Sequence, residues 1–281
     1  MNPVSRTARW IAAARAAETR RPDRLFEDRF AEALAGADGF ALLAQMTQMG
    51  RIASTGDGPP ENPYLAIRTR FIDDFLQAAL PRSEARQLVI LAAGLDARAY
   101  RLAFPAGTRV FELDRPEVLA FKDETLAQLG ARPSCERIAI PLDLTQPFGP
   151  ALRAAGFDPE QRSVWVVEGL LPYLDETEAA AVVSQCAELA TRGSELVGDL
   201  PGRSFLTSPY VQGLVKALAA MDAPWRFGTD DPEGFFARFG WTATARRPGE
   251  PDASYGRWTF PMAPRDTPGV PQSFYVTARR G

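Results

Sequence analysis

Acidic residues follow several short apolar runs of this sequence, at positions where carboxylates could bind a ligand. Asp114 ends the run TRVFELD, Asp143 follows ERIAIPL, and Glu168 follows SVWVV. Such runs are typical of buried parallel strands, whose carboxyl ends meet at one edge of a sheet and border its ligand-binding crevice. Three carboxylates at that edge predict a pocket for hydroxyls, amines and positive charge.

The first apolar run, QLVILAAG, ends in a glycine that allows the backbone to approach a ligand closely. Ala92, Gly94 and Ala97 form a degraded G-x-G-x-x-G pattern, which is a weak signal and is equally typical of a tight turn. Asp114 lies twenty positions after Gly94, the spacing at which an acid accepts hydrogen bonds from ribose hydroxyls. Capping of the following helix would explain Asp114 equally well, and Glu112 is a rival for the ribose role.

One arginine interrupts the apolar face of a helix predicted for residues 62–80, with Asn62 as its N-cap and Pro63 at its first helical position. At 3.6 residues per turn, Arg68 falls in the middle of that face. An inward arginine requires an anion, preferably one that it binds with two hydrogen bonds. The anion is either a protein carboxylate, such as Asp96 or Glu168, or the carboxylate of a bound ligand. Glu168 has the same two readings, a structural salt bridge or a ligand contact.

This set of groups fits S-adenosylmethionine (SAM) better than a dinucleotide. A dinucleotide carries a pyrophosphate, and the sequence offers no full glycine-rich anion cradle for it. SAM has hydroxyls, an amine, a positively charged sulfonium and a single carboxylate. The acids at the strand ends and Arg68 would satisfy these groups together.

The elements that must position these residues follow from the alternation of apolar runs and helical patterns. This alternation predicts an α/β fold with a parallel sheet covered on both faces. The last two runs, WTATARR and SFYVTAR, predict an antiparallel pair at one edge. We expect a helical cap and ligand-gripping helix over residues 1–80. A sheet domain over 81–281 would follow, with a lid inserted at about 201–240.

Composition excludes several other classes of function. The 281 residues are 46% apolar and 24% charged, which is typical of a folded globular protein. A net charge of −3 argues against a nucleic-acid partner, and no apolar run has the length of a membrane span. The chain has no histidine and only two cysteines, so we expect no histidine-based catalysis, no disulfide framework and no metal site. We predict a cytoplasmic protein. Nothing in the sequence indicates an oligomeric state.

Five segments in order also resemble the leucine carboxyl methyltransferase family, in particular its bacterial branch of SAM-dependent methyltransferases, which includes polyketide O-methyltransferases. The segments are YLAIRTRFIDDFL, VILAAGLDARAYRL, FELDRPEVLAFK, IPLDLTQPF and VVEGLLPYL, and AARAAETRRPDRLFEDRFA near the N-terminus is similar too. The resemblance implies a Rossmann-like class I methyltransferase fold. That fold has a mostly parallel seven-stranded sheet with an antiparallel edge strand, a helical cap and an inserted lid.

The resemblance also implies a role for each residue of the cofactor site. Arg68 would bind the carboxylate of SAM, Gly94 would lie behind its methionine moiety, and Glu168 would meet its amino-acid end. Asp114 would bind the ribose. Adenine would lie between Asp143 and Leu144. The family usually has Gly-Ala-Gly where this chain has Ala92-Ala93-Gly94. The extra methyl group at Ala92 would lower cofactor affinity unless Gly94 makes the close approach to the cofactor.

The missing histidine favours an acceptor that needs no general base. A carboxylic acid, with a pKa of about 4, is ionised at neutral pH, whereas a phenol, with a pKa of about 10, usually needs a base. We therefore predict O-methylation of a carboxylate on a small, polyketide-like natural product, with phenol methylation as an alternative. Candidates to orient the acceptor are Tyr64, Tyr173, Arg203 and Tyr210.

Two other functions agree with parts of the sequence. An NAD-dependent oxidoreductase would explain the spacing from Gly94 to Asp114, but it gives the inward Arg68 no role. A non-catalytic SAM-binding protein would use the same cofactor residues and would transfer no methyl group.

Overall fold

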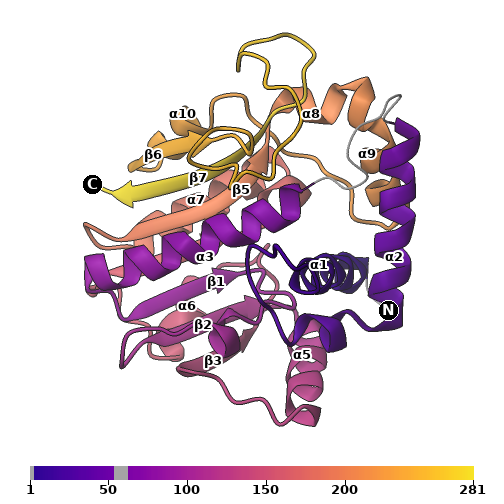
Figure 1. Ribbon diagram of the computed structural model, residues 1–281. Helices are drawn as coiled ribbons and strands as arrows, with labels where there is room; N and C mark the ends of the chain where they lie inside the picture. The colour runs from indigo at the N-terminus through magenta and orange to yellow at the C-terminus, as the bar shows by residue number, and fades with distance from the viewer. Residues whose placement is uncertain (1–2, 54–62) are drawn as a thin grey trace.

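The structure is a computed structural model that describes residues 3–53 and 63–281, and seven strands in this part of the chain form one sheet (Figure 1). Their order is β3-β2-β1-β4-β5-β7-β6. The first five strands are parallel, and β7 runs antiparallel to both of its neighbours. The strands are β1 (Gln87–Leu91), β2 (Arg109–Asp114), β3 (Glu136–Pro141), β4 (Ser163–Val167), β5 (Glu195–Pro201), β6 (Trp241–Arg246) and β7 (Ser273–Arg280).

This sheet confirms the predicted α/β fold and the antiparallel pair formed by the last two apolar runs. β6 lies at the edge of the sheet, and β7 lies between β6 and β5. The chain adds β2 and β3 on one side of β1, and then β4 and β5 on the other. The order therefore reverses between β1 and β4, and ligands bind at such a switch point.

Helices cover both faces of the sheet, as the continuous apolar strands predict. Val89 of β1 and Trp165 of β4 belong to a core with α6, α7 and α10, and Ile90 faces the opposite core with α3. The helices and 3₁₀ turns are α1 (Pro3–Thr19), α2 (Ala31–Ala53), α3 (Tyr64–Ser83), α4 (Arg98–Arg101), α5 (Pro116–Gln128), α6 (Gly149–Ala154), η1 (Leu171–Tyr173), α7 (Glu176–Leu189), α8 (Arg203–Thr207), η2 (Pro209–Val211), α9 (Gln212–Ala220) and α10 (Pro232–Ala237).

Helix α3 carries the predicted inward arginine, with bounds that differ slightly from the prediction. It begins at Tyr64, and Pro63 occupies the N-cap position instead of the first helical position, with its carbonyl accepting the amide of Ile67 at 2.9 Å. The predicted N-cap, Asn62, lies outside the described residues. The helix continues past Leu80 to Ser83, so Arg68 still lies in its first turns.

Helices α1, α2 and α9 lie beside the carboxyl edge of the parallel strands (Figure 1). α1 and α2 pack through small and aromatic side chains, and α2 kinks at Gly36, whose φ is 59°. Leu214 and Leu218 of α9 pack against Leu42 of α2. The division into a cap, a core and a lid stays a prediction. Within the described residues, no helix is both long and apolar enough to cross a membrane.

Candidate active site

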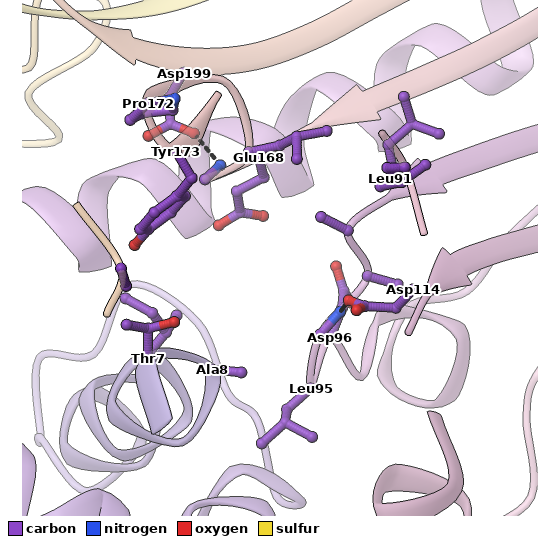
Figure 2. A pocket seen from close by; sticks show the side chains of 18 of the residues that line it. Thr7, Ala8, Leu91, Leu95, Asp96, Asp114, Glu168, Pro172, Tyr173 and Asp199 are labelled. Atoms are coloured by element: carbon purple, nitrogen blue, oxygen red, sulfur yellow. Dashed lines mark hydrogen bonds between the residues drawn. The ribbon is translucent and has the colours of Figure 1, made fainter. Parts of the chain in front are cut away.

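A cavity of about 450 Å³ opens at the carboxyl ends of the parallel strands, next to the switch point between β1 and β4. Thr7 and Tyr173 lie on one side of it, and Leu95, Asp96 and Asp114 lie on the other (Figure 2). The volume suits a ligand of the size of a nucleoside cofactor. Residues from five strand ends line this cavity, and they include all six residues predicted for the cofactor: Arg68, Gly94, Asp114, Asp143, Leu144 and Glu168.

Asp114 is held at one end of the cavity by backbone amides. Its Oδ2 accepts the amide of Gly94 at 2.6 Å, and its Oδ1 accepts the amide of Arg115 at 2.7 Å. Burial raises the pKa of the Asp114 carboxyl above its usual range. Arg115, not Asp114, occupies the N-cap position of α5, and it makes no side-chain cap. The helix-capping explanation of Asp114 is therefore wrong.

Glu112 is not part of the cavity, so it is no rival for the ribose role. It is fully buried on the face of β2 that α5 covers, where Lys122 Nζ and Arg137 Nε both lie 2.7 Å from Glu112 Oε2. The period of the strand does put Glu112 and Asp114 on one face. Only Asp114, at the end of the strand, reaches beyond the helix that covers that face.

Asp143 and Leu144 lie in the loop after β3, at the same end of the cavity as Asp114. Asp143 Oδ1 accepts the backbone amide of Thr145 at 3.0 Å and its hydroxyl at 2.9 Å. These hydrogen bonds lower the pKa of the Asp143 carboxyl. The loop therefore presents an ionised carboxylate and an apolar side chain next to each other.

Arg68 points into the cavity and contacts two protein carboxylates. Its Nη1 donates to Asp199 Oδ2 at 2.9 Å. Its Nε lies 2.9 Å from Glu168 Oε1, as an ion pair too bent for a hydrogen bond. Arg68 is only 7% exposed, which confirms that it faces the interior. Of the two protein partners that the sequence suggested, Glu168 is correct. Asp96 pairs with Arg98 instead.

Three further charged residues in this part of the cavity were missed by the sequence analysis. Asp199 lies two residues before the end of β5 and accepts the amide of Gly169 at 2.7 Å, so it too is an acid near a strand end and could have been found by that signal. Arg98 lies 2.7 Å from Glu168 Oε2 and is 2% exposed. Nearby guanidiniums lower the pKa values of Glu168 and Asp96 despite burial. No pattern distinguishes Arg98, or Arg101 one helical turn later, from ordinary surface arginines.

The four residues suggested for orienting an acceptor differ in position. Tyr64 and Tyr173 line the cavity, and burial raises the pKa of both hydroxyls. Tyr64 donates to Asp199 Oδ2 at 2.9 Å. Arg203 is exposed at the start of α8 and does not line the cavity, so its predicted role is not supported. Tyr210 belongs to η2, and its side chain lies outside what the structure describes.

Ala92 adopts a backbone conformation that normally requires glycine. Its φ is 51°, in the left-handed region, where a Cβ atom costs roughly 1 kcal/mol or more. We expect Ala92→Gly to raise the free energy of unfolding by about 1 kcal/mol, measured by urea denaturation. Ala93→Gly is the matched control, because Ala93 is buried and its φ is not positive. If both variants lose stability equally, Ala92 is not strained.

The sheet order and a cavity of this kind at its switch point define a Rossmann-like methyltransferase fold. A Streptomyces avermitilis protein of the DUF574 family has the same fold, with a TM-score of 0.61 at 16% identity and coverage of 98% of this chain and 97% of its own. A Thermobifida fusca protein named as a methyltransferase aligns with a TM-score of 0.59 at 17% identity, covering 87% of this chain and 89% of that protein.

The family follows from the sequence comparisons. The family model for leucine carboxyl methyltransferase matches residues 8–187. A Mycobacterium avium protein is 37% identical and a Mycobacterium ulcerans protein 38% identical, each over 99% of this chain and 95% of its own length. The names of both place them among SAM-dependent methyltransferases. The chain belongs to the leucine carboxyl methyltransferase family, which confirms the predicted resemblance and the prediction of a SAM-dependent methyltransferase.

Proposed function

We propose that the cavity binds SAM through the six predicted residues and that the enzyme methylates a carboxylate of a small, polyketide-like acceptor. Arg68 would bind the carboxylate of the methionine moiety through Nη2, because its Nε and Nη1 contact Glu168 and Asp199. Glu168 would meet the α-amino group. The buried, inward guanidinium of Arg68 beside two carboxylates is the observation that carries this assignment, since it suits a zwitterionic amino acid.

The other end of the cavity would hold the nucleoside. Asp114, fixed by the amides of Gly94 and Arg115, would accept hydrogen bonds from the ribose hydroxyls. Asp143 and Leu144 would flank adenine, one as a polar acceptor and one as an apolar wall. Gly94 lines the cavity with a φ of 50°, and its lack of a side chain allows the cofactor to approach this turn closely.

The acceptor would bind where apolar and aromatic side chains of α1, α3 and the segment after α9 line the cavity. Trp10, Leu65 and Trp225 form part of this wall, and Tyr173 contacts Trp225 edge to face with ring centroids 6.3 Å apart. Such a surface suits a planar, apolar body. The hydroxyls of Tyr64 and Tyr173 stay protonated, because their pKa values are raised, so each is a neutral hydrogen-bond group.

A carboxylate acceptor is supported by the state of the acids in the cavity. The pKa values of Glu168, Asp96 and Asp143 are lowered by guanidiniums or hydrogen bonds, so these groups are poor general bases. The pKa of Asp114 is raised by burial, but both of its oxygens accept backbone amides at the end of the cavity that we assign to the nucleoside. SAM supplies an already activated methyl group when it is bound. The protein then has to orient a nucleophile that is ionised in solution and to exclude water, which the apolar wall does.

The test measures methyl transfer from isotope-labelled SAM to pairs of aromatic acceptors. The two members of a pair share a ring system, and one carries a carboxylic acid where the other carries a phenol hydroxyl. We expect methyl esters, with a kcat/KM that is flat between about pH 6 and pH 8, because the acceptor pKa is about 4. A phenol acceptor would give a rate that rises about tenfold per pH unit in that range.

Three results would contradict the proposal in different ways. Methylation of the phenols alone would assign the enzyme to phenol O-methylation. Calorimetric binding of SAM without turnover of any acceptor would favour the non-catalytic alternative. Binding of NAD in place of SAM would favour an oxidoreductase and would overturn the assignment of the cavity.

A further inference from the structure

Arginines and carboxylates form a continuous series of ion pairs beneath the part of the cavity that we assign to the methionine moiety. The side chains of this charged chain are at most 16% exposed. They come from α1, the loop before α2, α3, the turn after β1 with α4, and the ends of β4 and β5. The members, in order of contact, are Arg15, Asp28, Arg101, Asp73, Arg98, Glu168, Arg68 and Asp199, and Asp96 is a further member that contacts Arg98.

The contacts at the α1 end of the chain join the first four members. Arg15 Nε lies 2.9 Å from Asp28 Oδ2, and Arg101 Nε lies 3.9 Å from the same oxygen. Arg101 Nη1 then lies 2.6 Å from Asp73 Oδ2. Arg98 Nε lies 2.7 Å from Asp73 Oδ1, so Asp73 links two guanidiniums. Asp28 and Asp73 do not line the cavity, although all three arginines do.

The contacts at the other end surround the proposed methionine site. Arg98 Nη1 contacts both Asp96 Oδ2 and Glu168 Oε2, the latter at 2.7 Å. Arg68 then bridges Glu168 and Asp199, at 2.9 Å from each. All five of these residues line the cavity. A charge on a ligand in this part of the cavity therefore interacts with the chain directly and across little water.

Both oxygens of every carboxylate in the charged chain contact nitrogen donors. Asp28 Oδ1 accepts the amide of Phe30, Asp96 Oδ1 accepts the amide of Arg98, and Asp199 Oδ1 accepts the amide of Gly169. The remaining carboxylate oxygens contact guanidinium nitrogens. The charged chain thus contains four guanidiniums and five carboxylates, which give these nine side chains a net charge of −1.

We propose that this unbalanced negative charge makes the site bind SAM more tightly than its product, S-adenosylhomocysteine (SAH), and so favours release of SAH. The inference rests on the proposed position of SAM in the cavity. The α-amino and α-carboxylate groups of either ligand cancel, which leaves a charge of +1 on SAM from its sulfonium and none on SAH. SAM brings the net charge of the charged chain and ligand to zero, whereas SAH leaves a net charge of −1 in a buried site.

The chemical step itself produces this change of charge. The carbon–sulfur bond of the methyl group breaks, and its electron pair stays on sulfur, which becomes a neutral thioether. A lone pair of the acceptor carboxylate forms the new oxygen–carbon bond, so the acceptor becomes a neutral ester and no proton moves. At the nucleoside end of the cavity, the cation of Arg115 offsets part of the charge of Asp114 and Asp143, so the charged chain carries the difference between the two ligands.

The first experiment compares three ligands on the unaltered protein by calorimetry: SAM, SAH and sinefungin, which carries a protonated amine in place of the sulfonium. We expect SAM and sinefungin to bind about tenfold or more tightly than SAH. The ratio should change little with salt, because the chain is buried. Equal affinity for SAM and SAH would overturn the inference. Failure of all three to bind would instead overturn the proposed function.

The second experiment removes one negative charge at a residue that does not touch the cavity. Asp73→Asn brings the net charge of the charged chain to zero, and we expect the ratio of SAM affinity to SAH affinity to fall toward 1. A purely structural role of Asp73 would weaken both ligands equally and leave the ratio unchanged, which would count against the inference. Asp252→Asn, at an exposed ion pair with Arg246, is the control and should preserve the ratio.

Discussion

Replacing Arg68 by alanine is expected to weaken SAM binding about 100-fold or more. The variant loses the proposed charge-assisted hydrogen bonds to the carboxylate of SAM, and it leaves Glu168 and Asp199 without their shared cation. Truncating one partner of a buried charge pair costs about 2–5 kcal/mol, which corresponds to a loss of affinity of about 30-fold to 4,000-fold and includes the expected value. Isothermal titration calorimetry with SAM measures the change.

Two variants on the same helix separate this effect from general damage to α3. Arg70→Ala removes a partly exposed guanidinium, which pairs with Asp74 at 2.8 Å, and should leave SAM affinity within about twofold. Arg68→Lys keeps the charge but not the planar fork, so its affinity should fall between those of Arg68→Ala and the unaltered protein. SAM affinity that survives Arg68→Ala would refute the assignment of Arg68.

The sheet was predictable because its strands carry a strong local signal. Runs such as VILAA and VWVV are continuous, apolar and rich in β-branched residues, and they read as strands buried on both faces without any tertiary information. The bounds of α3 were less predictable. Pro63 is equally compatible with the N-cap and the first helical position, and packing on the sheet extends the helix beyond Leu80.

The carboxylates of the candidate site were predictable from topology alone. Asp114 ends a strand, Asp143 and Glu168 each follow one, and parallel strands bring their carboxyl ends to one edge. Arg68 was detectable because it breaks an apolar face. Both signals are local in sequence, and the fold merely brings them together.

The charged chain could not be predicted, because its partners are distant in sequence. Asp73 and Arg98 are 25 positions apart, and Arg98 and Glu168 are 70 apart. Asp73 also lies beside Asp74 on a helix where local pairing with Arg70 explains both acids. Only Asp74 forms this local pair, and Asp73 is buried in the charged chain instead. A helix periodicity gives the direction of a side chain but not the element that packs against it.

Glu112→Ala is expected to lower the free energy of unfolding by about 3–5 kcal/mol. Glu112 and Lys122 have fully buried side chains, and Arg137 is 8% exposed at its side chain. Removing the carboxylate leaves the cations of Lys122 and Arg137 without the buried anion that both contact. An uncompensated buried charge is strongly destabilising. Urea denaturation followed by circular dichroism measures the loss.

Asp123→Ala is the matched control for this prediction. Asp123 also contacts Arg137, at 2.7 Å, but its side chain is 47% exposed, so its loss should cost less than about 1 kcal/mol. Glu112 does not line the cavity, so Glu112→Ala should leave SAM affinity within about twofold under conditions in which the variant is folded. A variant that kept its stability but lost SAM binding would instead return Glu112 to the ribose role and displace Asp114 from it.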